Sequence, residues 1–151
     1  MRNRQIEAGT RQAVAGSLRA GKGAAAPVQT VVEPVAPGIF FDGGTGYGAV
    51  LNAGTADTTR TRPAAPGGYI EIYCTGLGPV RATGEGIEAT TLTPQVWIGG
   101  VPATVSYSGL APGFEGLYQV NARVPDGLSG ERTAWVSVGG VRSNGVKIAV
   151  R

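Results

Sequence analysis

Two side chains on which many enzymes depend are absent or nearly absent from this sequence. None of the 151 residues is a histidine, and Cys74 is the only cysteine. Histidine is the commonest general base and a frequent metal ligand, so its absence removes the usual starting point for acid–base catalysis and for a zinc site. A single cysteine excludes an intramolecular disulfide bond. We therefore expect no enzymatic activity, no cofactor and no bound metal.

The few acidic residues do not follow a catalytic or calcium-binding pattern. Asp42, Asp57 and Asp126 are isolated along the chain, whereas a calcium loop needs closely spaced carboxylates. Glu85 and Glu88 lie close together in the sequence. To flank a sugar ring as a catalytic pair, they would need a partner across a cleft that the sequence does not show.

Basic charge is scarce outside the first part of the chain. Residues 1–22 carry five basic side chains and one acidic one, a net charge of +4, whereas the rest carries eight basic and nine acidic ones, a net charge of −1. No strand platform of aromatic and basic residues follows the basic segment, so we do not expect nucleic-acid binding.

Long apolar runs are also missing. No segment approaches eighteen consecutive apolar residues, so we expect no membrane-spanning helix. The start of the chain lacks the continuous apolar run of a signal peptide. We therefore expect that this chain begins partway into a longer gene product.

Glycine and proline, by contrast, are abundant, and short alternating segments lie between them. The 26 glycines and 10 prolines are typical of many short strands joined by tight turns. The clearest segment is 69–75, in which Ile70, Ile72 and Cys74 alternate with polar and aromatic residues, the period of a half-buried β-strand. This phase predicts that Cys74 is an inert thiol in the core.

Two glycine pairs predict tight hairpin turns. Gly99-Gly100 lies between the alternating segments 95–98 and 101–107, and Gly139-Gly140 follows the segment 133–138. Further strands are expected at 28–33, 39–41, 117–124 and 146–150, and the segments 53–66 and 79–93 are predicted to be loops. The pattern predicts an all-β, immunoglobulin-like β-sandwich of about seven to nine short strands.

The predicted organisation is a tail followed by one domain. Residues 1–27 form a basic, glycine- and alanine-rich extension that we expect to be disordered in isolation, and residues 28–151 form the sandwich. The sequence around 28–32 resembles that around 146–150. One interpretation is generic strand similarity; the other is that 28–33 is the closing strand of a preceding sandwich that this chain lacks.

A strand without its own domain has an open edge that can pair with another sheet. We therefore predict that segment 28–33 is exchanged with, or docks onto, a neighbouring chain or domain. The residues that would form this contact are Val28, Thr30, Val31 and Val32.

Seven separated motifs, in order, carry a family resemblance that covers about residues 30–151. They lie at 35–40, 47–52, 72–80, 96–103, 109–113, 116–121 and 124–127. Together they resemble the carboxy-terminal repeat domain abundant in Solibacter and other Acidobacteria, and the domain is similar to the IPT/TIG branch of immunoglobulin-like sandwiches. The resemblance implies an exported or cell-surface accessory module at the end of a larger protein, with no assigned catalytic residues. This chain is nearly the domain alone, which favours a standalone structural subunit.

Two non-enzymatic functions are therefore expected. The first is an extracellular or cell-surface structural subunit that assembles with its own copies into a fibre through segment 28–33. The second is an accessory adhesion module that binds carbohydrate or another surface protein. Tyr69, Tyr73, Trp97 and Trp135 lie out of phase with the aliphatic residues and could form a flat stacking face, or they could cover a second core layer.

Overall fold

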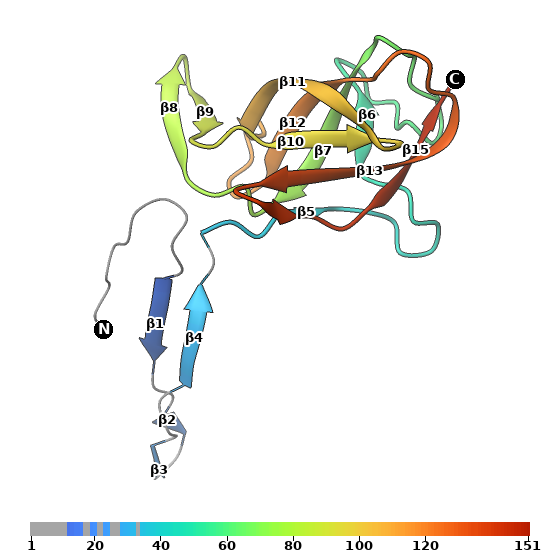
Figure 1. Cartoon of the computed structure of the whole chain (residues 1–151). Helices are drawn as coiled ribbons and strands as arrows, with labels where there is room; N and C mark the ends of the chain where they lie inside the picture. Colours follow the sequence, from blue (N-terminus) through green and yellow to red (C-terminus); the bar gives the residue numbers. More distant parts are fainter. Residues whose placement is uncertain (1–11, 17–18, 21–22, 25–27, 33) are drawn as a thin grey trace. The chain divides into compact units, whose positions relative to one another are not determined.

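The computed structural model describes residues 12–16, 19–20, 23–24, 28–32 and 34–151, and every regular element within them is a β-strand (Figure 1). The all-β prediction is confirmed. Among these residues no helix is long and apolar enough to cross a membrane. The chain divides into two compact units, Met1–Pro34 and Val35–Arg151.

The first unit contains an antiparallel ladder of two strands. β1 (Gln12–Gly16) pairs with β4 (Val28–Val32) along their whole length, and the short strands β2 (Arg19–Ala20) and β3 (Gly23–Ala24) pair with each other in the intervening segment. The strand expected at 28–33 is therefore present as β4, while Glu33 lies outside the described residues. β1, β2 and β3 fall within segment 1–27, which we expect to be disordered in isolation, and the rest of that segment lies outside the described residues.

The second unit is one curled sheet of eleven strands whose ladders are antiparallel. The central order is β14-β13-β10-β11-β12-β7-β5; β15 also pairs with β13, β6 with β7, and β9 with both β8 and β11. The strands are β5 (Gly38–Ile39), β6 (Val50–Asn52), β7 (Tyr69–Thr75), β8 (Val80–Gly84), β9 (Ile87–Thr90), β10 (Gln95–Ile98), β11 (Val101–Leu110), β12 (Tyr118–Arg123), β13 (Gly130–Val138), β14 (Val141–Arg142) and β15 (Val146–Val150). This count exceeds the expected seven to nine.

Part of the excess comes from segment 79–93, for which the loop prediction is wrong. Its residues form the β8–β9 hairpin, with Val80 opposite Thr90 and Arg81 opposite Ala89. All of β8 after Val80 is exposed. A strand without a buried face leaves no apolar alternation in its sequence, so periodicity could not reveal it.

Both glycine-pair turns are confirmed. Gly99 and Gly100 have φ angles of 58° and 79° between Ile98 and Val101, which face each other in the β10–β11 ladder. Gly139 and Gly140 have φ angles of 56° and 81° between β13 and β14. Two successive positive φ angles match the twist of the flanking strands, and glycine adopts them without the steric cost that a Cβ brings.

The core lies on the concave side of the curl and confirms the predicted phase of β7. Ile70, Ile72 and Cys74 are fully buried, and Ile98 and Val120 join them from β10 and β12. Fully burying a large aliphatic side chain contributes about 1.5–3 kcal/mol. Burial also raises the pKa of the Cys74 thiol to about 12, which keeps it protonated and unreactive at neutral pH.

Candidate functional site

Trp97 and Trp135 form a stacked pair on the outer side of the sheet. They lie directly opposite each other in the β10–β13 ladder, with ring centroids 5.2 Å apart and ring planes 10° from parallel. Their neighbours along each strand, Val96 and Ala134 among them, are buried, so the alternation of the strands turns both indoles outward. Both rings are half-buried.

Arg142 closes one end of this stack. Its guanidinium carbon lies 4.1 Å from the centre of the Trp135 ring. Since β14 and β10 lie on opposite sides of β13, Trp135 is placed between Arg142 and Trp97. The cation–π contact at such an exposed position contributes about 0.5–1 kcal/mol. Both ring faces of Trp135 are therefore covered, one by Arg142 and one by Trp97, whereas only one ring face of Trp97 is covered by Trp135.

The remaining face of Trp97 adjoins a shallow depression of about 230 Å³. Pro102 faces Trp97 across the β10–β11 ladder, and Pro94 and Val105 also line the depression. Its volume lies below the 300–1,000 Å³ that is usual for small-molecule sites. The stacked pair thus offers one ring face and a small apolar recess.

The two tyrosines predicted with the tryptophans lie elsewhere. Tyr69 and Tyr73 are on β7, which is separated from β10 by β11 and β12. Tyr69 is 47% exposed, while Tyr73 is half-buried and donates a hydrogen bond to Glu71 at 3.1 Å. Burial, together with the nearby Glu71 carboxylate, raises the pKa of Tyr73. The structure therefore brings together the two tryptophans and separates them from the tyrosines.

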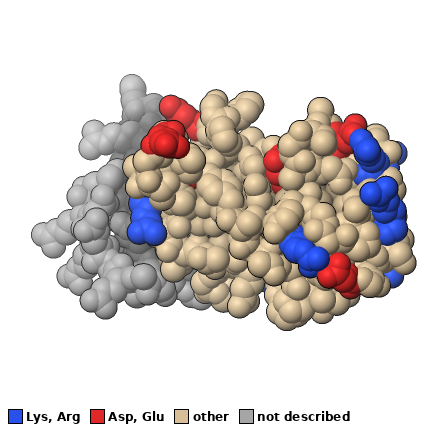
Figure 2. Space-filling view, turned by 90° about the horizontal axis from the view of Figure 1, so that it is seen from above, with Lys and Arg blue, Asp and Glu red and all other residues tan. Residues whose placement is uncertain are grey.

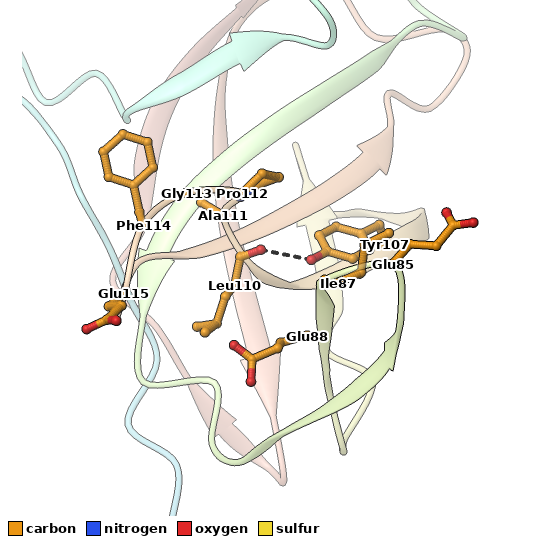
Figure 3. A pocket seen from close by; sticks show the side chains of 11 residues that line it. Glu85, Ile87, Glu88, Tyr107, Leu110, Ala111, Pro112, Gly113, Phe114 and Glu115 are labelled. Atoms are coloured by element: carbon orange, nitrogen blue, oxygen red, sulfur yellow. Dashed lines mark hydrogen bonds between the residues drawn. The ribbon is translucent and has the colours of Figure 1, made fainter.

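A cavity of about 390 Å³ supplies the cleft that the sequence could not show for Glu85 and Glu88 (Figure 3). Glu115 lines it from the segment that follows β11, and Figure 3 shows the aromatic rings of Tyr107 and Phe114 among the other lining side chains. The three carboxylate side chains are exposed.

Tyr107 is held at this cavity by its own strand. Its hydroxyl donates a hydrogen bond to the Leu110 carbonyl at 2.8 Å, and burial, followed by the Glu88 carboxylate, raises its pKa. Within the part of the chain that the structure describes, no cluster of three His, Cys, Asp or Glu side chains has the arrangement of a metal site.

Sequence reasoning did not single out a third hollow, of about 590 Å³, beside the end of β5. Phe40 and Phe41 line it and are 47% and 56% exposed. Arg60 lies 5.6 Å from the centre of the Tyr47 ring and 3.6 Å from an Asp42 carboxylate oxygen. The Gly44 backbone N–H, which donates to the Asp42 carboxylate at 2.8 Å, lowers the pKa of Asp42. The adjacent residues Phe40 and Phe41 could have indicated this hollow in the sequence. A strand buries only alternate residues, so two adjacent phenylalanines predict that at least one ring is exposed.

Charged side chains are sparse on the face of the molecule seen in Figure 2, where uncharged residues predominate. Basic and acidic groups are scattered over this face, including toward its middle (Figure 2). Among the described residues, two exposed ion pairs bring opposite charges together: Lys147 lies 3.2 Å from Glu131, and Arg62 lies 3.2 Å from Asp57.

No protein-family model matches the chain, and the search of curated proteins finds no match. The assignment of a function therefore depends on the geometry of this chain. Its candidate features are the stacked tryptophans, the cavity beside Tyr107, the hollow beside Phe41, and the strand ladder of the first unit.

Proposed function

We propose that this protein is a non-enzymatic structural subunit of a bacterial cell surface or extracellular assembly, and that its copies join through the N-terminal strands. The observation that carries the proposal is the β1–β4 ladder, which belongs to a compact unit apart from the main sheet. A two-stranded hairpin is marginally stable in water. The described residues supply no further strand on either outer side of this ladder, so both sides are edges. Pairing with the sheet of a neighbouring copy would stabilise it.

The sequence of β4 suits this role. Val28, Thr30, Val31 and Val32 are β-branched and Gln29 is uncharged, so β4 contains neither charge nor proline. Natural edge strands use charged side chains and proline to prevent pairing with other strands. Because β4 lacks both and is rich in β-branched residues, it is suited to pairing. We infer that β4 is an assembly strand.

The fold within this proposal is an immunoglobulin-like sandwich of the IPT/TIG type. Its support is the antiparallel curled sheet, together with the seven motifs that resemble the Solibacter-type repeat domain. The extracellular or cell-surface location rests on the same resemblance. The non-enzymatic role rests on the lack of histidine and on the inert position of Cys74.

Light scattering coupled to size-exclusion chromatography tests the proposal. The full chain is expected to form oligomers whose mass grows with concentration. A variant that lacks residues 1–33 is expected to elute as a folded monomer, because the second unit contains its own core. Circular dichroism checks that the shortened variant is folded. An unchanged oligomeric state after the deletion would contradict the assembly role.

A second function, accessory binding of carbohydrate or of a surface protein, is favoured by the open ring face of Trp97. The indoles stack on each other, so they do not lie side by side as the platform that an extended polysaccharide would need. The recess fits a single sugar ring or one apolar side chain. Retention on a polysaccharide affinity gel is expected to be lost in Trp97→Ala and kept in Tyr69→Ala. Equal retention of both variants, or no retention of the unaltered protein, would contradict carbohydrate binding at Trp97.

A further inference from the structure

At most edges of the curled sheet, the outward-facing backbone groups of the edge strand are hydrogen-bonded to another segment or side chain. β15 is covered by two short segments: the Gly48 N–H donates to the Lys147 carbonyl at 3.0 Å, and the Ala64 N–H donates to the Ala149 carbonyl at 2.9 Å. Backbone groups of β15 that would otherwise face solvent are thereby paired. This edge is not available to another chain.

β5 is closed by a side chain that imitates a strand. The Ile39 N–H donates to Asn144 Oδ1 at 2.8 Å, and Asn144 Nδ2 donates to the Ile39 carbonyl at 3.0 Å. The carboxamide therefore satisfies the two backbone groups that a neighbouring strand would otherwise bind. Asn144 closes the edge at the end of the sheet.

β6 is closed by the segment that follows it. The Asn52 N–H donates to the Asp57 carbonyl, and the Thr59 N–H donates to the Val50 carbonyl, each at 2.9 Å. Together with β5, β6 occupies the side of β7 that faces away from β12. On their outer sides, the edge strands that flank β7 therefore have hydrogen-bond partners, the Asn144 side chain for β5 and backbone groups for β6.

β8 is different. Four of its five residues pair with β9, with a register shift between Ala82 and Gly84, and no other described strand pairs with β8. β14 also lies at an edge, but it is only two residues long. Within the second unit, β8 is therefore the longest strand for which the described residues supply no partner on one side.

The hydrogen-bond phase of the hairpin shows which groups this open edge presents. The Thr91 N–H donates to the Pro79 carbonyl at 2.9 Å, so these two residues form a hydrogen-bonded pair of the antiparallel ladder. The backbone carbonyl of Pro79 therefore points toward the β9 side. Bonded and non-bonded pairs alternate in an antiparallel ladder. The N–H and C=O groups of Val80 and Ala82 therefore point away from β9, in the direction from which a further strand would approach.

We propose that β8 is the receiving edge for β4 of a second copy of this chain. This inference rests on the proposed assembly function and names its acceptor. Both strands are five residues long, and β4 carries no charge that would oppose pairing. The donor strand and the receiving edge are different surfaces. Repetition of such a head-to-tail contact extends a fibre unless its rotation closes a ring.

Disulfide trapping between two populations of the full chain tests this contact. One population carries Gln29→Cys or Thr30→Cys, which sample both faces of β4, and the other carries Arg81→Cys and an affinity tag that changes its size. Val141→Cys on β14, an exposed residue at the competing edge, replaces Arg81→Cys in the matched control. The native Cys74 is fully buried with a pKa of about 12, so it contributes little background.

After mild oxidation with copper phenanthroline, a heterodimer is expected from Arg81→Cys at a yield at least about tenfold above that from Val141→Cys. Equal or higher yields at Val141→Cys would overturn β8 as the acceptor. If the full chain nevertheless forms oligomers, and the deletion of residues 1–33 converts them to monomers, the proposed function stands and only this inference fails. If the full chain forms no oligomer, both fail.

A second variant keeps the inference testable without an engineered thiol. Ala82→Pro removes an N–H that points away from β9, so it spares the β8–β9 hydrogen bonds. The expected result is a folded protein with an unchanged circular dichroism spectrum and an association constant at least about tenfold lower. Leu92→Pro, at an exposed residue in the connection between β9 and β10, is the matched control and is expected to assemble normally. Normal assembly of a folded Ala82→Pro variant would overturn the inference.

Discussion

Two hairpins of the same sheet, β8–β9 and β10–β11, differ in burial and in the number of strands with which they pair. Ile98 at the β10–β11 turn is fully buried, and β10 has partners on both sides. Ile87 in the β8–β9 hairpin is 44% exposed. This hairpin pairs with β11 at one ladder position, Gly109 opposite Ala89, and Thr90 adds a side-chain hydrogen bond to Ser108. The first hairpin belongs to the core, whereas the second extends from it with one side open. The comparison shows where the sheet is stable and where it can accept a partner.

The largest expected difference between the hairpins is the cost of truncating one isoleucine in each. Ile98→Ala is expected to lower the free energy of unfolding by about 2–5 kcal/mol, because it removes buried methyl groups and leaves a cavity. Ile87→Ala is expected to change it by less than about 0.5 kcal/mol. Urea denaturation of the shortened variant that lacks residues 1–33 measures both. Similar costs would show that the β8–β9 hairpin belongs to the core.

The attachment of the β8–β9 hairpin gives the next largest effect. A Cβ at Gly109 would overlap the Glu88 carbonyl oxygen and the Tyr107 hydroxyl, so only glycine permits this close approach. Gly109→Ala is expected to cost about 1–3 kcal/mol and to speed amide exchange selectively in β8 and β9. Hydrogen exchange with mass spectrometry measures this. Equal acceleration in β10 and β11 would contradict a separate attachment.

The turn of the buried hairpin should show a smaller, purely conformational effect. Gly100 has a φ of 79°, and a Cβ added there would meet no atom within 4 Å. Gly100→Ala is therefore expected to destabilise the domain by about 1–2 kcal/mol through its left-handed backbone alone. Thermal denaturation measures the change, and Gly100→Asn, which tolerates this conformation better, is expected to recover part of it. A loss as large as that of Ile98→Ala would point to packing instead.

The smallest effect concerns the closed edge at β15. Lys147 and Tyr47, which both bond to Glu131, lower the pKa of Glu131, with Lys147 the larger cause. A carboxyl group whose pKa is lowered by folding stabilises the protein above its unfolded pKa, and this contribution is lost as the pH falls through the folded value. Glu131→Gln is expected to flatten slightly the acid side of the stability profile below about pH 4.5. Identical profiles would mean that this exposed pair contributes nothing.

The contrast between the hairpins also explains what the sequence could predict. Periodicity revealed the strands around Ile70 and Ile98 because each buries alternate residues, and the Gly99-Gly100 pair specified its own turn. The exposed β8 carries no such alternation, and β1, with the sequence Gln-Ala-Val-Ala-Gly, gives only a weak signal. The exposed strand β8 and the weakly patterned β1 were therefore not predicted.

The candidate site was predictable only in part for a related reason. The alternation put Trp97 and Trp135 out of phase with the aliphatic residues, and in the structure both are half-buried while their neighbours Val96 and Ala134 are buried. Their stacking depends on the pairing of β10 with β13, two strands far apart in the sequence, and no local pattern specifies that register. The same long-range dependence hid that Glu115 lines the same cavity as Glu85 and Glu88.

Hydrogen exchange of β8 as a function of protein concentration tests the central claim most directly. If β4 of a second copy adds to this edge, amide protection in Val80–Gly84 rises with concentration in the full chain. It stays low in the variant without residues 1–33, while β10 and β11 remain protected throughout. Exchange in β8 that stays fast in an assembled full chain would contradict the claim.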